Sequence, residues 1–206
     1  MLETIANTAA APETRLGRSV APRARLHPGQ SGIVELRDGR DAFAARVLLA
    51  DTAERTLDLQ YYIWRKDMSG SLLFAAVCRA ADRGVRVRLL LDDNNTTGLD
   101  GFLGALASHP NIKVRLFNPF RLRRFRPLEY LTDFARLNRR MHNKSFTVDG
   151  QVAIVGGRNI GDEYFDAHQA LSFVDLDVMA VGPAASEIAS DFERYWQSES
   201  ARPAES

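Results

Sequence analysis

The sequence has almost no cysteine, no long apolar run and almost no net charge. A single cysteine, Cys78, among 206 residues excludes an intramolecular disulfide and a zinc site built on several thiolates. No stretch approaches the roughly 18 consecutive apolar residues of a membrane-spanning helix. Residues 1–22 lack the apolar segment of a signal peptide. With 45% hydrophobic residues and a formal net charge of +1, the chain is expected to form a folded core, and it lacks the overall charge of a nucleic-acid-binding protein.

The charges are distributed unevenly along the chain. Residues 1–112 are nearly neutral, residues 113–144 carry ten basic and two acidic side chains, and residues 145–206 carry three basic and eleven acidic ones. Such a basic segment is either a solvated loop or a positive field around an anionic substrate or surface. Because the segment ends at His142 and Lys144, we favour the second interpretation.

The apolar pattern predicts strands that alternate with helices. Strands are expected at residues 33–36, 57–64, 85–91, 113–117, 144–148, 151–155 and 176–181. Helical spacing of apolar residues occurs at residues 43–50, 72–81, 101–107 and 184–196. This order is typical of βαβ units, and it predicts an α/β fold with a mixed, largely parallel β-sheet flanked by helices.

We interpret residues 32–198 as a single folded unit. Residues 1–31 are rich in alanine, proline, arginine and threonine without a clear period, and they predict a flexible N-terminal arm. Residues 199–206 are expected to form a loose C-terminal tail.

The strongest chemical signal lies in the hairpin predicted around the Asp149-Gly150 turn. Six residues of chemical interest occur there at short spacing: His142, Lys144, Asp149, Gly156, Gly157 and Asn159. On one strand, His142 and Lys144 would point to the same face, and an imidazole beside a fixed cation suits phosphodiester chemistry. The Asn159 amide would reach the same phosphate, and the two glycines would allow close approach of the backbone. A lone His-x-Lys is usually a surface pair, so the combination in one hairpin carries the hypothesis.

The segment HNKSFTVDG followed by VGGRN resembles the signature of the phospholipase D superfamily, H-x-K-x4-D and then G-x-N. The segments LDLQYYIWRKDMSG, GVRVRLLLDDNN, ARLNRRMHNKSFTVDG and GGRNIGDEYFD resemble the N-terminal half of bacterial cardiolipin synthases. The resemblance covers about residues 25–198. It implies a phospholipase D-like half-domain that transfers a phosphatidyl group between phospholipids through a phosphohistidine, with hydrolysis as a side reaction.

The resemblance also implies roles for the motif residues. His142 would be either the nucleophile or the general acid, and Lys144 and Asn159 would hold the phosphoryl oxygens. Asp149 lies out of phase with His142 on a continuous strand, so we expect it to fix the turn. Asp175 would orient the imidazole and hold its tautomer, with Asp177 as the second choice.

Further residues are predicted to contact the substrate or the membrane. The candidates for substrate binding are Gly156, Gly157, Arg158, Tyr62 and Arg140. The candidates for an anionic membrane surface are Arg121, Arg123, Arg124 and Arg126, which lie among aromatic residues. That mixture also suits single-stranded nucleic acid, although the resemblance favours anionic phospholipid and a peripheral location at the bacterial inner membrane. No metal or cofactor is implied, because the protein's own cations supply the electrostatic stabilisation.

The sequence departs from the family because it contains only one H-x-K-x4-D motif. Family enzymes bring two such motifs to one site, and neither His27, His109 nor His168 begins a second His-x-Lys. The chain is therefore expected to act with a second half, either further sequence or a second copy. A homodimeric nuclease and a non-catalytic lipid-binding half are the alternatives.

A weaker candidate is the polar run Asp92-Asp93-Asn94-Asn95 at the end of the strand predicted over 85–91. Ligands bind at such strand ends in α/β sheets, but a polar turn explains the run slightly better.

Overall fold

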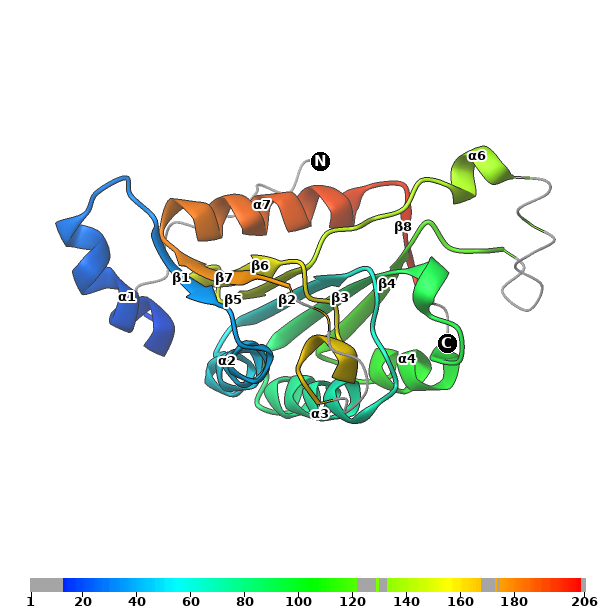
Figure 1. Ribbon diagram of the computed structural model, residues 1–206, viewed down its shortest axis with the longest axis horizontal. Coiled ribbons are helices and arrows are strands. Elements are labelled where there is room, and N and C mark those ends of the chain that lie inside the picture. Colours follow the sequence, from blue (N-terminus) through cyan, green and yellow to red (C-terminus); the bar gives the residue numbers. More distant parts are fainter. Residues whose placement is uncertain (1–12, 122–128, 130–132, 168–172, 174, 205–206) are drawn as a thin grey trace.

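Figure 1 shows the protein as a computed structural model, which describes residues 13–121, 129, 133–167, 173 and 175–204. The strands are β1 Gly32–Leu36, β2 Thr56–Tyr61, β3 Arg86–Asp92, β4 Ile112–Phe117, β5 Ser145–Val148, β6 Val152–Gly156, β7 Asp177–Val181 and β8 Ala201–Pro203. The helices are α1 Arg15–Leu26, α2 Gly39–Thr52, α3 Met68–Asp82, α4 Asp100–Ala107, α6 Phe134–Leu137 and α7 Pro183–Gln197, with the 3-10 turns η1 Asp93–Asn95 and η3 Asp162–Tyr164.

The strands form one eight-stranded sheet in the order β1-β7-β6-β5-β2-β3-β4-β8. Helices α2, α3 and α4 cover one face and α7 covers the other (Figure 1). The predicted mixed α/β sheet flanked by helices is confirmed. Its parallel part is smaller than the sequence indicated, because only β2, β3 and β4 run parallel and the other neighbouring strands are antiparallel.

Side chains cap the N-termini of the two helices that lead into the central strands, α2 and α3. Asp38 accepts hydrogen bonds from the first backbone N–H groups of α2, and Asp67 caps α3 in the same way. The side chains of Leu73 and Val77 on α3 are fully buried in the main core. This core lies between the sheet and helices α2, α3 and α4. A smaller core on the opposite face includes Phe192 of α7.

Two elements lie in the segments that the sequence predicted to be an arm and a tail. Helix α1 begins after Thr14, whose side chain caps Gly17, and it continues through Pro22. This segment has few apolar residues, and an internal proline disfavours a helix. Strand β8 extends the sheet beside β4 with only three residues, too few for a period-two pattern.

Several ends of the central strands lie together at one edge of the sheet. Gln60, near the carboxyl end of β2, pairs with Ser145 at the start of β5, and Ser145 pairs with Val155 near the end of β6. Gly156 pairs with Asp177 at the start of β7. The carboxyl ends of β3 and β4 lie at the same edge, because both run parallel to β2.

Candidate active site

His142 and Lys144 lie in the irregular segment just before β5 rather than on a strand. Because β5 begins at Ser145, the expectation that strand alternation aligns the two side chains is wrong. They meet at Tyr62 instead. The imidazole of His142 stacks on the Tyr62 ring with centroids 3.9 Å apart, and Nζ of Lys144 lies 5.5 Å from the same ring centroid. Lys144 Nζ also donates a hydrogen bond of 2.6 Å to the carbonyl oxygen of His142.

The environments of these two side chains differ. His142 is exposed, so its imidazole is open to a substrate. Lys144 is half-buried, and this burial lowers the pKa of its ammonium, although the nearby Asp175 carboxylate opposes the effect. Lys144 borders an open cavity of about 480 Å³ that also contacts Gln60, Gly156 and the α7 residues Glu187 and Asp191. That Lys144 holds the phosphoryl oxygens of a substrate stays a prediction.

Asp149 lies at the far end of the β5–β6 hairpin, away from His142. Its φ of 52° and the φ of 64° at Gly150 form the tight turn that the sequence predicted. Its carboxylate accepts hydrogen bonds from the backbone N–H groups of Glu54, Arg55 and Thr56. The turn-fixing interpretation of Asp149 agrees with these contacts, which tie the turn to the start of β2.

Asn159 and Arg158 face the protein. The Asn159 Oδ1 accepts from the Ile63 N–H at 3.0 Å, and its amide donates to the Tyr164 hydroxyl. Its contact with a phosphoryl oxygen stays a prediction. Arg158 is 2% exposed and donates to the carbonyl oxygens of residues 36, 37 and 164. The prediction that Arg158 binds substrate is wrong, because its guanidinium is enclosed by these backbone acceptors.

The two carboxylates predicted to orient His142, Asp175 and Asp177, differ in burial and in partners. Asp177 is fully buried and pairs with the Arg46 guanidinium at 2.8 Å, so it does not orient the His142 imidazole. Asp175 is half-buried and acts on the pKa of Lys144. No hydrogen bond joins it to His142 among the described residues, so its orienting role stays a prediction.

Gly156 and Gly157 make room for the protein's own carboxylates. A Cβ atom on Gly156 would collide with Asp177 and the carbonyl oxygen of Leu176, and one on Gly157 would collide with Asp175. The prediction that the two glycines open the backbone to a phosphate is corrected accordingly: these glycines allow the start of β7 to approach β6.

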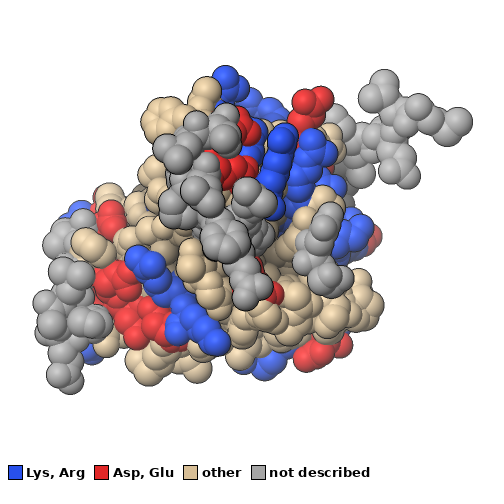
Figure 2. Space-filling view, turned by 90° about the vertical axis from the view of Figure 1, so that its right-hand side faces the viewer, with Lys and Arg blue, Asp and Glu red and all other residues tan. Residues whose placement is uncertain are grey.

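The structure describes only part of the basic segment, residues 113–144. Arg123, Arg124 and Arg126 lie outside the described residues, and Arg121 is exposed. On the side from which α6 projects, lysine and arginine side chains gather next to acidic ones (Figure 2). Within the basic segment, Arg136 pairs with Glu129 and Asp133. Part of the positive charge is therefore neutralised locally.

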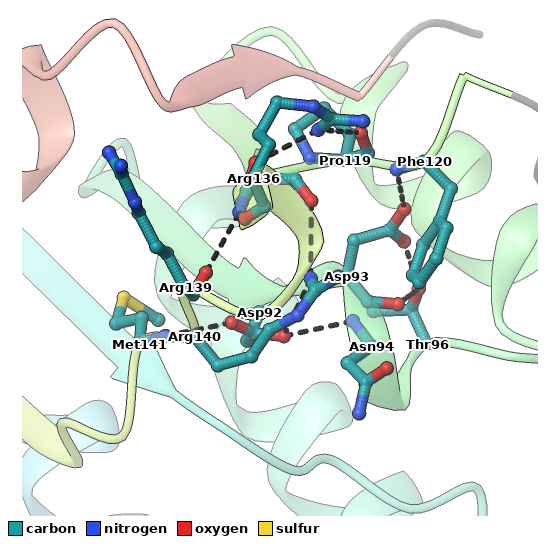
Figure 3. Close-up of polar contacts among 11 residues, drawn as sticks. Asp92, Asp93, Asn94, Thr96, Pro119, Phe120, Arg136, Arg139, Arg140 and Met141 are labelled. Carbon is teal, nitrogen blue, oxygen red and sulfur yellow. Dashed lines mark hydrogen bonds and ion pairs between the residues drawn. The ribbon is translucent and has the colours of Figure 1, made fainter. Parts of the chain in front are cut away.

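Arg140 does not point freely to solvent. Its side chain is 9% exposed, pairs with Asp92 at 3.3 Å and lies over the Phe120 ring (Figure 3). Only Nη1 makes internal hydrogen bonds, and Nε and Nη2 have no hydrogen-bond partner in the described part of the chain, so the role of Arg140 in substrate binding stays a prediction. The sequence did not indicate that the Tyr62 ring stacks on His142, because Tyr62 lies 80 residues earlier in the chain, directly after β2.

Within the described part of the chain, no group of three or more His, Cys, Asp or Glu side chains is arranged to hold a metal ion. In the same part, no helix is both long and apolar enough to cross a membrane.

The fold and the His142–Lys144 arrangement define a phospholipase D-like domain. Residues 48–196 match the family described as cardiolipin synthase, phospholipase D-like domain, and the chain belongs to this family. It is 64% identical over 189 residues to cardiolipin synthase C of Escherichia coli, covering 92% of this chain and 40% of that protein. It is 32% identical over 162 residues to a major cardiolipin synthase of Bacillus subtilis, covering 78% of this chain and 32% of that protein. The chain thus spans between about a third and two fifths of the length of these relatives.

Solved structures share the fold. NucT from Helicobacter pylori superposes with a TM-score of 0.62 at 16% identity, covering 84% of this chain and 98% of that one. The phosphatidylserine synthase of Haemophilus influenzae gives a TM-score of 0.63 at 13% identity, covering 84% of this chain and 38% of that one. At these identities the likeness concerns the fold alone.

Proposed function

We propose that the chain forms one half of a phospholipase D-type active site that transfers a phosphatidyl group between phospholipids. The observation that carries this proposal is the exposed His142 imidazole stacked on Tyr62, with the Lys144 ammonium over the same ring. This arrangement offers a nucleophile and a fixed cation at one edge of the sheet. The identity to cardiolipin synthases supports cardiolipin as the product of the transfer.

In the proposed reaction, a nitrogen of His142 bonds to the phosphorus of the donor lipid, and the bond from phosphorus to the headgroup oxygen breaks. An imidazole from a second motif gives this oxygen its proton. The hydroxyl of the acceptor lipid then attacks the phosphohistidine, returns a proton to the second imidazole and frees His142. Lys144 stabilises the charge on the phosphoryl oxygens in both steps. The roles of the two imidazoles can be exchanged without changing this balance.

The proposal requires a second half, because one imidazole cannot attack phosphorus and protonate the leaving oxygen on the opposite side. The partial coverage of the longer relatives supports this requirement. Turnover of phosphatidylglycerol vesicles is measured for the 206-residue chain as a monomer, verified by light scattering, and for the natural full-length protein or a dimer. We expect little turnover from the monomer and full turnover from the assembly. Full activity in a monomer would contradict the proposal.

Cleavage of single-stranded DNA and binding to lipid vesicles, measured beside lipid turnover, separate the alternatives. A homodimeric nuclease would cleave single-stranded DNA in place of transferring a phosphatidyl group, and the basic segment is the feature that favours it. A non-catalytic half would bind lipid vesicles but give no turnover in any assembly.

We also propose that the basic segment holds the protein at an anionic membrane surface. Each basic residue near such a surface contributes about 1 kcal/mol, weakened by salt. Replacing Arg121, Arg123, Arg124 and Arg126 together by glutamine should reduce co-sedimentation with anionic vesicles by orders of magnitude, with neutral vesicles unaffected. Unchanged binding together with a lower melting temperature would instead assign these arginines a structural role.

A further inference from the structure

We propose that Asp92 is a positioning residue that fixes the chain leading into His142, an inference that rests on the proposed function of His142. The two residues lie at the same edge of the sheet but on different elements, Asp92 at the end of β3 and His142 before β5. Figure 3 shows the contacts that connect Asp92 to the segment around Arg140 and Met141.

The two oxygens of Asp92 serve different parts of the chain. Oδ1 accepts from the backbone N–H of Asn94 at 2.9 Å, the local contact expected of a polar turn. Oδ2 accepts from the backbone N–H of Met141 at 2.8 Å, across 49 residues of sequence. A turn needs only the first bond, so a polar turn does not account for the second. Met141 directly precedes His142.

The residues next to Met141 are held as well. Arg140 Nη1 donates to Asp92 Oδ1 at 3.3 Å and to the carbonyl oxygen of Asn118 at 3.2 Å, and its guanidinium lies 4.9 Å from the Phe120 ring centroid. Asn118, directly after β4, donates through its amide to the carbonyl oxygens of Arg136 and Arg139. The strand ends of β3 and β4 thereby hold the backbone from residue 136 to residue 141.

The Met141 side chain is anchored from a third strand. It is 1% exposed, and its Sδ accepts a hydrogen bond of 3.0 Å from the Gln60 amide on β2. His142 itself has few contacts of its own: the Tyr62 ring stacks against it, and Lys144 binds its carbonyl oxygen. Its imidazole is exposed, so its location depends mainly on the backbone that Asp92 holds.

Burying the Asp92 side chain is costly. It is 0% exposed, and burial raises its pKa although two backbone N–H groups and Arg140 favour the charged form. A buried carboxylate retained under these conditions contributes geometry that an apolar side chain cannot supply, because only an acceptor can fix the Met141 N–H.

The test compares Asp92→Asn with Asp58→Asn in the natural full-length protein. Asp58 is a matched control, because it is a carboxylate on β2, 7% exposed, that pairs with Arg88. A misplacement of about 1 Å costs roughly 100-fold in rate. We therefore expect Asp92→Asn to lower kcat by about 10- to 100-fold per folded molecule, with KM nearly unchanged, and Asp58→Asn to leave kcat unchanged.

Hydrogen exchange read by mass spectrometry gives a second measurement that does not depend on activity. The Met141 amide should exchange at least about tenfold faster in Asp92→Asn than in the parent and in Asp58→Asn, because its acceptor is weakened. Unchanged kcat in folded Asp92→Asn, or an equal loss of kcat in Asp58→Asn, would overturn the proposal. If the parent itself gives no turnover, the proposed function fails, and the exchange of Met141 alone decides whether Asp92 holds this segment.

If Asp92→Asn does not fold, Arg140→Lys replaces it. This variant keeps the positive charge but lacks the guanidinium, whose Nη1 donates to both Asp92 and the Asn118 carbonyl oxygen and whose plane lies near the Phe120 ring. We expect a smaller loss of kcat, about two- to tenfold, with the same faster exchange at Met141. Normal kcat and normal exchange in Arg140→Lys would overturn the proposal.

Discussion

The two ends of the β5–β6 hairpin carry residues of the same motif but differ in burial and in hydrogen-bond partners. At the turn, Asp149 is buried and accepts three backbone N–H groups. At the open end, His142 is exposed and Lys144 borders a cavity. A motif read in sequence thus combines residues that hold the fold with residues that are available to a substrate. The predictions below test whether this division is real.

The largest effect is expected for His142→Ala at the open end. Loss of a nucleophile or a general acid should reduce turnover by several orders of magnitude, while the melting temperature stays near that of the parent. His109→Ala is the matched control, because His109 lies elsewhere and contacts Asp82 on α3. Near-normal turnover in a folded His142→Ala protein would exclude this residue from the chemistry.

The next effect concerns stability at a buried ion pair behind the site. Arg46 is 1% exposed and binds both Asp177 and the Tyr61 hydroxyl. Arg46→Met leaves the Asp177 charge without its main partner, and breaking a buried pair costs about 3–5 kcal/mol. Urea unfolding should give this loss, whereas Arg79→Met, at the exposed pair with Asp51, should change stability by less than about 1 kcal/mol. Equal effects of both substitutions would contradict the structural role of the buried pair.

Asp149→Ala tests the turn directly. The change removes the acceptor of three N–H groups and places alanine at a φ of 52°. We expect unfolding free energy to fall by about 1–3 kcal/mol, with kcat per folded molecule unchanged. Asp149→Asn, which tolerates this φ and keeps one acceptor oxygen, should lose less. If Asp149→Asn were fully stable but inactive, Asp149 would take part in the chemistry.

The sequence predicted the strands and helices with strong patterns, because alternation and helical spacing reflect burial directly. The hairpin turn was also predictable, since Asp149-Gly150 suits positive φ at both positions. Helix α1 and strand β8 were not, because their stability comes from contacts with distant segments. Arg15 of α1, for example, donates its backbone N–H to Glu54.

The candidate site was only partly predictable for the same reason. Spacing identified His142 and Lys144, but it could not show that both contact the ring of Tyr62, which directly follows β2. Nor could spacing distinguish Arg158, which is enclosed by carbonyl oxygens, from an arginine that binds substrate. The long-range bond from Asp92 to Met141 likewise has no local signal, so the polar run after β3 looked like a turn.

The smallest effect is expected in the pH dependence of Lys144. Burial lowers its pKa below the ordinary 10.5, so the ammonium loses its proton at a lower pH than an exposed lysine does. Activity that needs this charge should therefore decline on the alkaline side below pH 10.5. The sign for stability is opposite, because folding disfavours the charged form: the penalty is present at neutral pH and is relieved as pH rises through the folded pKa.

Lys144→Arg separates this charge from other alkaline effects. Arginine stays protonated throughout the range, so the alkaline decline of kcat/KM should move to higher pH, although the different shape lowers the maximum. Lys66→Arg, at an exposed position, should leave the profile unchanged. If the alkaline decline of Lys144→Arg coincided with that of the parent, another group would control it. The Lys144 ammonium would then not be the charge that the open end of the hairpin presents to phosphate.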